Sequence, residues 1–103
     1  MLFRSAHITG GGIPGNLNRA LPKTLDAVVD SSTWEVPSVF KFIQERGGIE
    51  KDEMFRAFNM GVGMVLIVRN SAEELVLAML REKDEQPVIL GGIVKGTGKV
   101  VLS

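Results

Sequence analysis

The residues best suited to chemistry lie together near the start of the sequence, in the segment His7-Ile8-Thr9-Gly10-Gly11-Gly12. If this segment begins as a strand, His7 and Thr9 share one face, because side chains alternate along an extended backbone. An imidazole can hydrogen-bond a substrate or transfer a proton near pH 7. Glycines after a strand let the backbone turn and direct N–H groups at an anion, and the start of a following helix adds partial positive charge. The segment therefore predicts a site for a phosphate or a polarised carbonyl.

Charge near this segment supports the same interpretation. The first 25 residues hold Arg4, Arg19 and Lys23 and no carboxylate, so the local potential favours a negatively charged group. Glycine runs are weak evidence on spacing alone, and a tight strand-to-helix turn beside a half-buried His7 fits the same residues. Both interpretations are open at the level of sequence.

A second glycine-rich segment, Asn59-Met60-Gly61-Val62-Gly63, lies at a predicted helix-to-strand junction. The Asn59 carboxamide can donate and accept hydrogen bonds at once. Gly61 and Gly63 remove side chains at alternate positions, which lets a ligand or another backbone approach closely. A helix cap at Asn59, with glycines that accommodate a packed helix, explains the same residues without a ligand. For a shared site, we expect residues 7–12 and 58–63 to lie side by side in the fold.

Composition excludes several kinds of site. The sequence has no Cys, one His and no Tyr, which excludes a disulfide, a thiolate nucleophile, a zinc–thiolate centre and a site with two His ligands from this chain. No segment matches an EF-hand loop. Glu50, Asp52 and Glu53 are interpreted as the solvated first turn of a helix, where acids stabilise the helix dipole. We therefore predict no metal site in this chain.

Charge and hydropathy limit the partners. Lys plus Arg and Asp plus Glu both number 12 in the 103 residues, so the chain lacks the basic excess that supplies most nucleic-acid affinity. The longest apolar runs, such as residues 60–68, are far shorter than the ~20 residues of a membrane helix. The start of the sequence lacks the pattern of a signal peptide. We expect a cytoplasmic protein that binds neither nucleic acid nor membrane.

Hydrophobic periodicity and helix breakers predict five strands and four helices, in the order β-α-β-α-α-β-α-β-β. In chain order these elements span residues 2–9, 17–21, 25–29, 36–47, 51–58, 64–68, 72–83, 87–94 and 100–102. Strands separated by helices imply the α/β (α+β) class, as a layered sandwich with a mixed sheet. The length fits one domain that comprises residues 1–103.

Four local features make this prediction more specific. The continuous apolar run at residues 64–68 is typical of a strand buried on both faces. Ser71 and Glu74 form a capping-box pattern ahead of a helix with apolar residues at helical spacing. Pro37 fits the first position of its helix. Residues 95–99 are expected to form a hairpin loop between the last two strands.

Several landmarks recur in order along residues 4–94. They are HITGGG at 7–12, Asn16, Leu21-Pro22, Trp34-x-x-Pro37-x-x-Phe40, Gly47-Gly48, Glu53-Met54 and FNMGVGM at 58–64. Together these residues resemble one family, the C-terminal domain of phosphoribosylformylglycinamidine cyclo-ligase, also called AIR synthetase. Two uncommon motifs with landmarks between them make the resemblance specific.

The resemblance implies a domain of an ATP-dependent ligase in purine biosynthesis, which closes formylglycinamidine ribonucleotide to aminoimidazole ribonucleotide and releases ADP and phosphate. It also implies Mg²⁺ with the ATP, a homodimer when full length, and an N-terminal ATP-binding domain that is absent from this chain. The chain would then form one wall of the active-site cleft. We expect it to be inactive alone, because phosphoryl transfer needs metal ligands and a phosphate cradle together.

By the same resemblance, His7 and Asn59 are expected to be catalytic: His7 would contact the substrate or transfer a proton, and Asn59 would orient a substrate amide or support the loop. The expected substrate- and phosphate-binding residues are Thr9, Gly10, Gly11, Gly12, Gly61 and Gly63. The alternative is a free-standing nucleotide-binding or regulatory α/β module, or an assembly domain, of the same superfamily.

Overall fold

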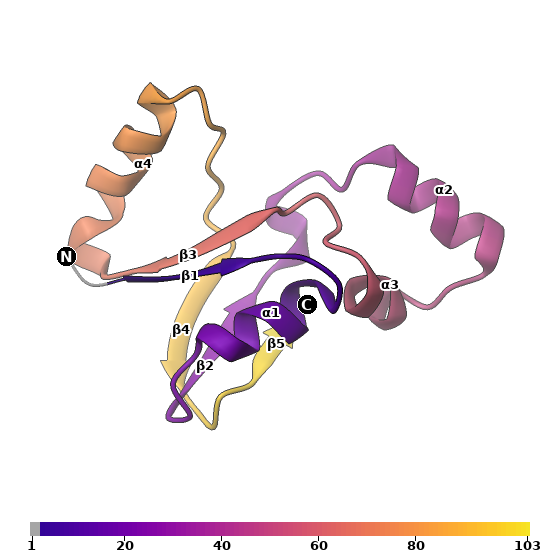
Figure 1. Ribbon diagram of the computed structural model, residues 1–103, viewed down its shortest axis with the longest axis horizontal. Coiled ribbons are helices and arrows are strands. Elements are labelled where there is room, and N and C mark those ends of the chain that lie inside the picture. Colours follow the sequence, from indigo (N-terminus) through magenta and orange to yellow (C-terminus); the bar gives the residue numbers. More distant parts are fainter. Residues whose placement is uncertain (1–2) are drawn as a thin grey trace.

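The computed structural model describes residues 3–103, which form two small sheets, four α-helices and two 3-10 turns (Figure 1). In chain order the elements are β1 (Phe3–His7), α1 (Gly12–Ala20), β2 (Leu25–Val29), η1 (Ser31–Thr33), α2 (Ser38–Gly47), α3 (Lys51–Ala57), β3 (Met64–Val68), η2 (Asn70–Ala72), α4 (Glu73–Glu82), β4 (Gly91–Lys95) and β5 (Val100–Leu102). The order of strands and helices is the predicted one, and β2 and β3 have the expected bounds. The α/β class is confirmed; residue 2 of the first expected strand lies outside the described residues.

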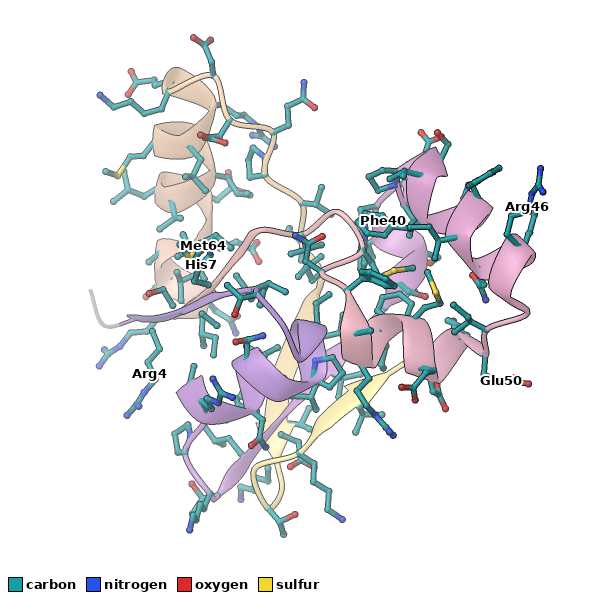
Figure 2. The ribbon with its side chains drawn as sticks, turned by 45° about the vertical axis from the view of Figure 1, so that its right-hand side comes forward. Arg4, His7, Phe40, Arg46, Glu50 and Met64 are labelled. Carbon is teal, nitrogen blue, oxygen red and sulfur yellow. The ribbon has the colours of Figure 1, made fainter. Side chains whose placement is uncertain are left out.

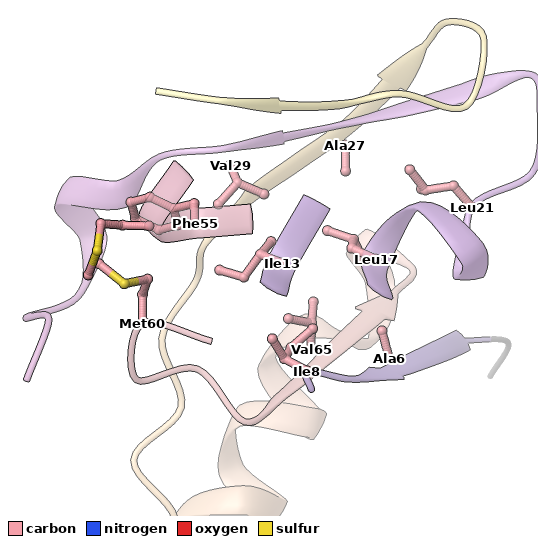
Figure 3. Close-up of a cluster of buried hydrophobic side chains, with 11 residues drawn as sticks. Ala6, Ile8, Ile13, Leu17, Leu21, Ala27, Val29, Phe55, Met60 and Val65 are labelled. Carbon is pink, nitrogen blue, oxygen red and sulfur yellow. The ribbon is translucent and has the colours of Figure 1, made fainter. Parts of the chain in front are cut away.

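Two sheets enclose helix α1. β1 and β3 pair antiparallel as a two-stranded ribbon, from Phe3 opposite Val68 to His7 opposite Met64. In the second sheet β2 is central, antiparallel to β4 and parallel to β5, so this sheet is mixed as expected. Figure 3 shows Ile13 of α1 between the two sheets.

Helix α1 joins the two sheets through its apolar face. Ile13 and Leu17, one helical turn apart, are buried. The buried residues around them are Ala6, Ile8 and Val65 from the ribbon and its flank, and Ala27 and Val29 from the second sheet. Burial of one such Ile or Leu side chain contributes about 1.5–3 kcal/mol. The core therefore lies between the sheets, and α1 supplies its centre.

Helix α1 begins at Gly12 rather than at residue 17. Its N-cap, Gly11, has a left-handed φ of 99°, which glycine adopts without steric cost. Pro14 then falls in the first turn, where its missing N–H is not needed. Helix α2 also differs slightly from expectation, because Pro37 is its N-cap and not its first helical residue.

The prediction that residues 64–68 are buried on both faces is wrong. Val65 is buried in the core, but Met64 and Leu66, on the opposite face of β3, are 55% and 36% exposed. The reason is that the core helix α1 covers one face of the ribbon, and within residues 3–103 no second layer seals the other face. An apolar run shows what a strand is able to bury, not whether the same chain covers it.

Helix α4 differs from expectation at its start and on its apolar face. Its N-cap, Ala72, makes no side-chain cap bond, and Ser71 lies inside the preceding turn η2. The predicted capping box is therefore not formed. Leu75 and Met79 are each 54% exposed, because α4 projects away from the two sheets (Figure 1).

The predicted hairpin at residues 95–99 is wrong. β4 and β5 pair with opposite edges of β2, so the loop between them passes around one end of β2. There the Oδ1 atom of Asp26 accepts hydrogen bonds from the backbone N–H groups of Lys99 (2.8 Å), Thr97 (2.8 Å) and Gly98 (3.1 Å). These bonds, led by that from Lys99, hold the pKa of Asp26 below its ordinary value. β4 itself begins only at Gly91, later than the expected residue 87.

Replacement of Asp26 by Asn tests this loop anchor. Because the folded-state pKa is lowered, the carboxylate stabilises the fold above its unfolded pKa of about 3.9, and this contribution is lost as the pH falls through the folded value. We expect Asp26→Asn to lower the urea midpoint at pH 7, and the difference from wild type to shrink as the pH falls below about 4. Glu85→Gln, at an exposed carboxylate, is the control. An unchanged midpoint at pH 7 would contradict the anchor.

Candidate functional site

The two glycine-rich segments lie side by side, as predicted. The backbone N–H of Ile8 donates to the carbonyl of Gly63 at 2.9 Å. Gly12 lies directly against α3, where an added side-chain carbon would collide with the carbonyl oxygens of Phe55 and Phe58. The turn after β1 therefore sits on the end of α3 and beside the turn that leads into β3.

A buried carboxamide, Asn16, holds the first glycine segment. Its Nδ2 donates to the carbonyls of Gly12 (2.8 Å), Thr9 (3.3 Å) and Gly10 (3.3 Å), and its Oδ1 accepts from the Thr9 hydroxyl at 3.3 Å. Asn16 is only 7% exposed. Asn16 is not among the residues predicted to form the site, because its partners are main-chain carbonyls that a sequence does not display. Its place among the family landmarks is the one signal that the sequence offers.

The inward carbonyls fix the direction of the neighbouring amides. In a trans peptide the C=O and the following N–H point in opposite directions. The N–H groups of Gly10 and Gly11 therefore point away from Asn16. Gly10 is exposed and Gly11 half-buried, and neither N–H donates to a backbone carbonyl within residues 3–103. These two amides are thus directed outward, whereas the Gly12 N–H donates to Thr9 at 3.0 Å.

His7 lies on the open face of the ribbon. Its neighbours Ala6 and Ile8 are buried in the core, so the imidazole points to the opposite face, beside Met64 (Figure 2). The side chain is exposed, which corrects the half-buried position in the alternative interpretation. His7, Gly61 and Gly63 line one cavity of about 920 Å³. The structure thus gathers three of the predicted site residues around one space.

The other predicted residues lie outside the wall of this cavity. Gly10 and Gly11 carry the outward amides, and the remaining ones have structural contacts. Thr9 bonds to Asn16, and Gly12 is buried against α3, so in this structure Gly12 packs rather than presents an amide. Asn59 shapes the second turn, because its Oδ1 accepts from the Gly61 N–H at 2.9 Å.

The second turn is braced by an aromatic residue. Met60 and Gly61 both have positive φ, 54° and 98°, and the Nε1 of Trp34 donates to the Met60 carbonyl at 3.1 Å. Gly61 lies against Pro37, where a side-chain carbon would be 2.5 Å from Cδ, whereas Gly63 has open space around it. Room for a ligand therefore exists at Gly63, and Gly61 is required by the turn.

The described residues form neither a cluster of metal ligands nor a membrane-spanning helix. Within the part of the chain that the structure describes, no group of three or more His, Asp or Glu side chains could hold a metal ion. None of the helices described there has the length and apolar character to cross a bilayer.

The fold and the two turns define a mixed α/β domain in which one histidine lines a cavity and the turn that follows its strand carries two outward backbone amides. The family model for the C-terminal domain of AIR synthase related proteins matches residues 4–103. The chain belongs to this family, which confirms the resemblance drawn from its motifs.

Curated relatives agree with this assignment. The chain is 49% identical over 96 residues to the phosphoribosylformylglycinamidine cyclo-ligase of Alkaliphilus metalliredigens, an alignment that covers 93% of this chain and 28% of the relative. It is 50% identical over 90 residues to the enzyme of the same name from Geotalea daltonii, and that alignment covers 87% of this chain and 26% of the relative. The relative of the same name from Thermodesulfovibrio yellowstonii is 46% identical over 91 residues, which are 88% of this chain and 26% of the relative. The chain thus spans little more than a quarter of the length of these relatives.

Gly12 and Gly10 form a matched pair for testing how the first segment is packed. Gly12 has a φ of +64° and lies against the backbone of α3, whereas Gly10 has no atom within 4 Å of an added Cβ. We expect Gly12→Ala to cost more than about 4 kcal/mol or to prevent folding, and Gly10→Ala to stay within about 0.5 kcal/mol of wild type. Urea unfolding measures both. Equal effects at the two positions would contradict the packing described.

Asn16→Ala tests the carboxamide. The substitution leaves partly buried carbonyls without their donor, so we expect the free energy of unfolding to fall by about 1–3 kcal/mol. Asn70→Ala, at an exposed asparagine, is the control and should change it by less than about 0.5 kcal/mol. If both variants unfold at the wild-type urea concentration, Asn16 does not hold the loop.

Proposed function

We propose that this chain is part of an ATP-dependent cyclo-ligase that closes formylglycinamidine ribonucleotide to aminoimidazole ribonucleotide, and that it forms one wall of the active-site cleft. The names of the relatives and the family membership support the reaction class and purine biosynthesis. The observation that carries the role of this chain is the pair of outward amides at Gly10 and Gly11, in the turn that follows the strand of the exposed His7.

Each predicted residue has a role in this proposal. The Gly10 and Gly11 N–H groups bind the phosphate or the formyl oxygen, where preorganised donors stabilise negative charge at no cost of reorganisation. His7 hydrogen-bonds the substrate or moves a proton during ring closure. Gly63 leaves room for the substrate. The remaining residues, Thr9, Gly12, Asn59 and Gly61, hold the two turns in place.

The nucleotide and metal fit this chain only in part. ATP activates the formyl oxygen by phosphorylating it, and an amidine nitrogen then displaces phosphate to close the ring. The outward amides suit a phosphate, but residues 3–103 offer no cluster of metal ligands. We therefore assign Mg²⁺ and most ATP contacts to an N-terminal ATP-binding domain outside this chain. Residues 1–103 would form a single domain of a cytoplasmic homodimer and would be inactive alone.

A chimaera tests the proposed reaction. In the Alkaliphilus metalliredigens relative, the 96 matched residues are replaced by the corresponding residues of this chain, and conversion of formylglycinamidine ribonucleotide is measured with ATP and Mg²⁺. We expect activity from the chimaera and none from the isolated chain. A folded but inactive chimaera would contradict the proposal, and tight ATP binding by the isolated chain would favour a free-standing nucleotide-binding module.

In the same chimaera, His7→Ala tests the histidine. Loss of an acid–base group typically lowers kcat by about 10²–10⁴-fold, and we expect a decrease of that size. Ser5→Ala removes a polar group from the same face of β1 and should leave kcat unchanged. Unaltered turnover in the folded His7→Ala chimaera would remove His7 from the catalytic residues.

A further inference from the structure

The outer edge of β3 carries unpaired backbone groups. In an antiparallel pair, residues whose backbone groups face each other alternate with residues whose groups point outward. The bond from Ile8 to Gly63 and the register of the ribbon place Ala6 opposite Val65 in the facing set. The N–H and C=O groups of Met64 and Leu66 therefore point outward on one edge, and those of Ser5 and His7 on the other. No backbone hydrogen bond from Met64 or Leu66 to a loop or turn occurs within the described chain.

The large cavity runs along this edge of β3. All five residues of β3 line it, but β1 contributes only His7. Since alternate residues of a strand point to opposite faces, a cavity that touches all five follows the edge of the strand. The other walls include α4, the segment that descends from it into β4, and residues 27–29 of β2 (Figure 1). The outer edge of β3 thus lies along a groove that has protein walls.

The walls of the groove are apolar and exposed. Six large hydrophobic side chains that line it are at least 36% exposed: Val28, Met64, Leu66, Val88, Ile89 and Ile93. An unpaired strand edge next to apolar walls suits one kind of occupant, an extended segment that bonds through its main chain and buries alternate side chains. A two-stranded ribbon is marginally stable alone in water, and a third strand would stabilise it.

The length of the relatives indicates where such a segment comes from. The chain covers 28% of the Alkaliphilus metalliredigens relative and 26% of two others. We propose that an extended segment of the full-length polypeptide, outside these 103 residues, adds to the free edge of β3 as a third strand of the ribbon. The proposal concerns assembly and does not depend on the cyclo-ligase reaction.

Amide hydrogen exchange compares the two edges directly. In the isolated chain, the Leu66 and Ser5 amides lie opposite each other and both point outward. In the chimaera, we expect exchange at Leu66 to slow by about 100-fold or more, with little change at Ser5. The proposal would be overturned if exchange slowed equally at the two amides, or if it slowed at Ser5 alone. Protection of Leu66 in an inactive chimaera would uphold the docking and reject only the proposed function.

Two proline variants provide an independent test. Leu66→Pro and Ser5→Pro each remove one outward N–H and leave the β1–β3 hydrogen bonds intact, since proline is tolerated where a strand N–H faces away from its partner. In the chimaera we expect Leu66→Pro to lower the melting temperature clearly more than Ser5→Pro, and in the isolated chain we expect equal effects. The reverse order in the chimaera would overturn the proposal. So would protection of Leu66 in the isolated chain that rises with its concentration, because the occupant would then be a second copy.

Discussion

The carboxamide of Asn16 is the interaction on which the geometry of the site depends. Its Nδ2 group draws three carbonyls of the turn after β1 toward the interior, and the planarity of the peptide then directs the Gly10 and Gly11 amides outward. An apolar side chain of similar size would fill the volume but leave these carbonyls without a donor. Within residues 3–103, no buried side-chain nitrogen or oxygen lacks a hydrogen-bond partner. The outward amides are therefore a consequence of satisfying buried polar atoms.

The same constraint extends from this turn into α3 and the second turn. Gly12 lets α1 approach the backbone of α3, and the bond from Ile8 to Gly63 ties the ribbon to the following loop. Trp34 completes the support, since it bonds to Met60 and packs edge-on against Phe55, with ring centroids 6.2 Å apart. The two turns are thus held by different elements that converge on α3.

The sequence allowed the order of elements and the adjacency of the two turns to be predicted, but not how the surfaces are covered. β2 and β3 were located correctly because short β-branched runs end at polar residues such as Asp30. The exposure of Leu66 could not be foreseen, because a pattern shows which residues can be buried and not what lies opposite them. The hairpin prediction failed because a short loop favours a hairpin, whereas the carboxylate that holds this loop, Asp26, is 71 positions away from Thr97. Long-range partners of this kind leave no local signal.

The central position of β2 also determines when its sheet can form during synthesis. Both neighbours of β2 are synthesised more than 60 residues after it, as β4 (Gly91–Lys95) and β5 (Val100–Leu102). At a translation rate of roughly 5–20 residues per second, the ribosome needs about 4–14 s to advance the 71 positions from Asp26 to Thr97. For most of that interval the nascent strand LDAVV has neither neighbour and offers two bare edges to other chains. The sheet therefore cannot be completed until residues 91–102 have been synthesised, and until then the edges of β2 need protection from other chains.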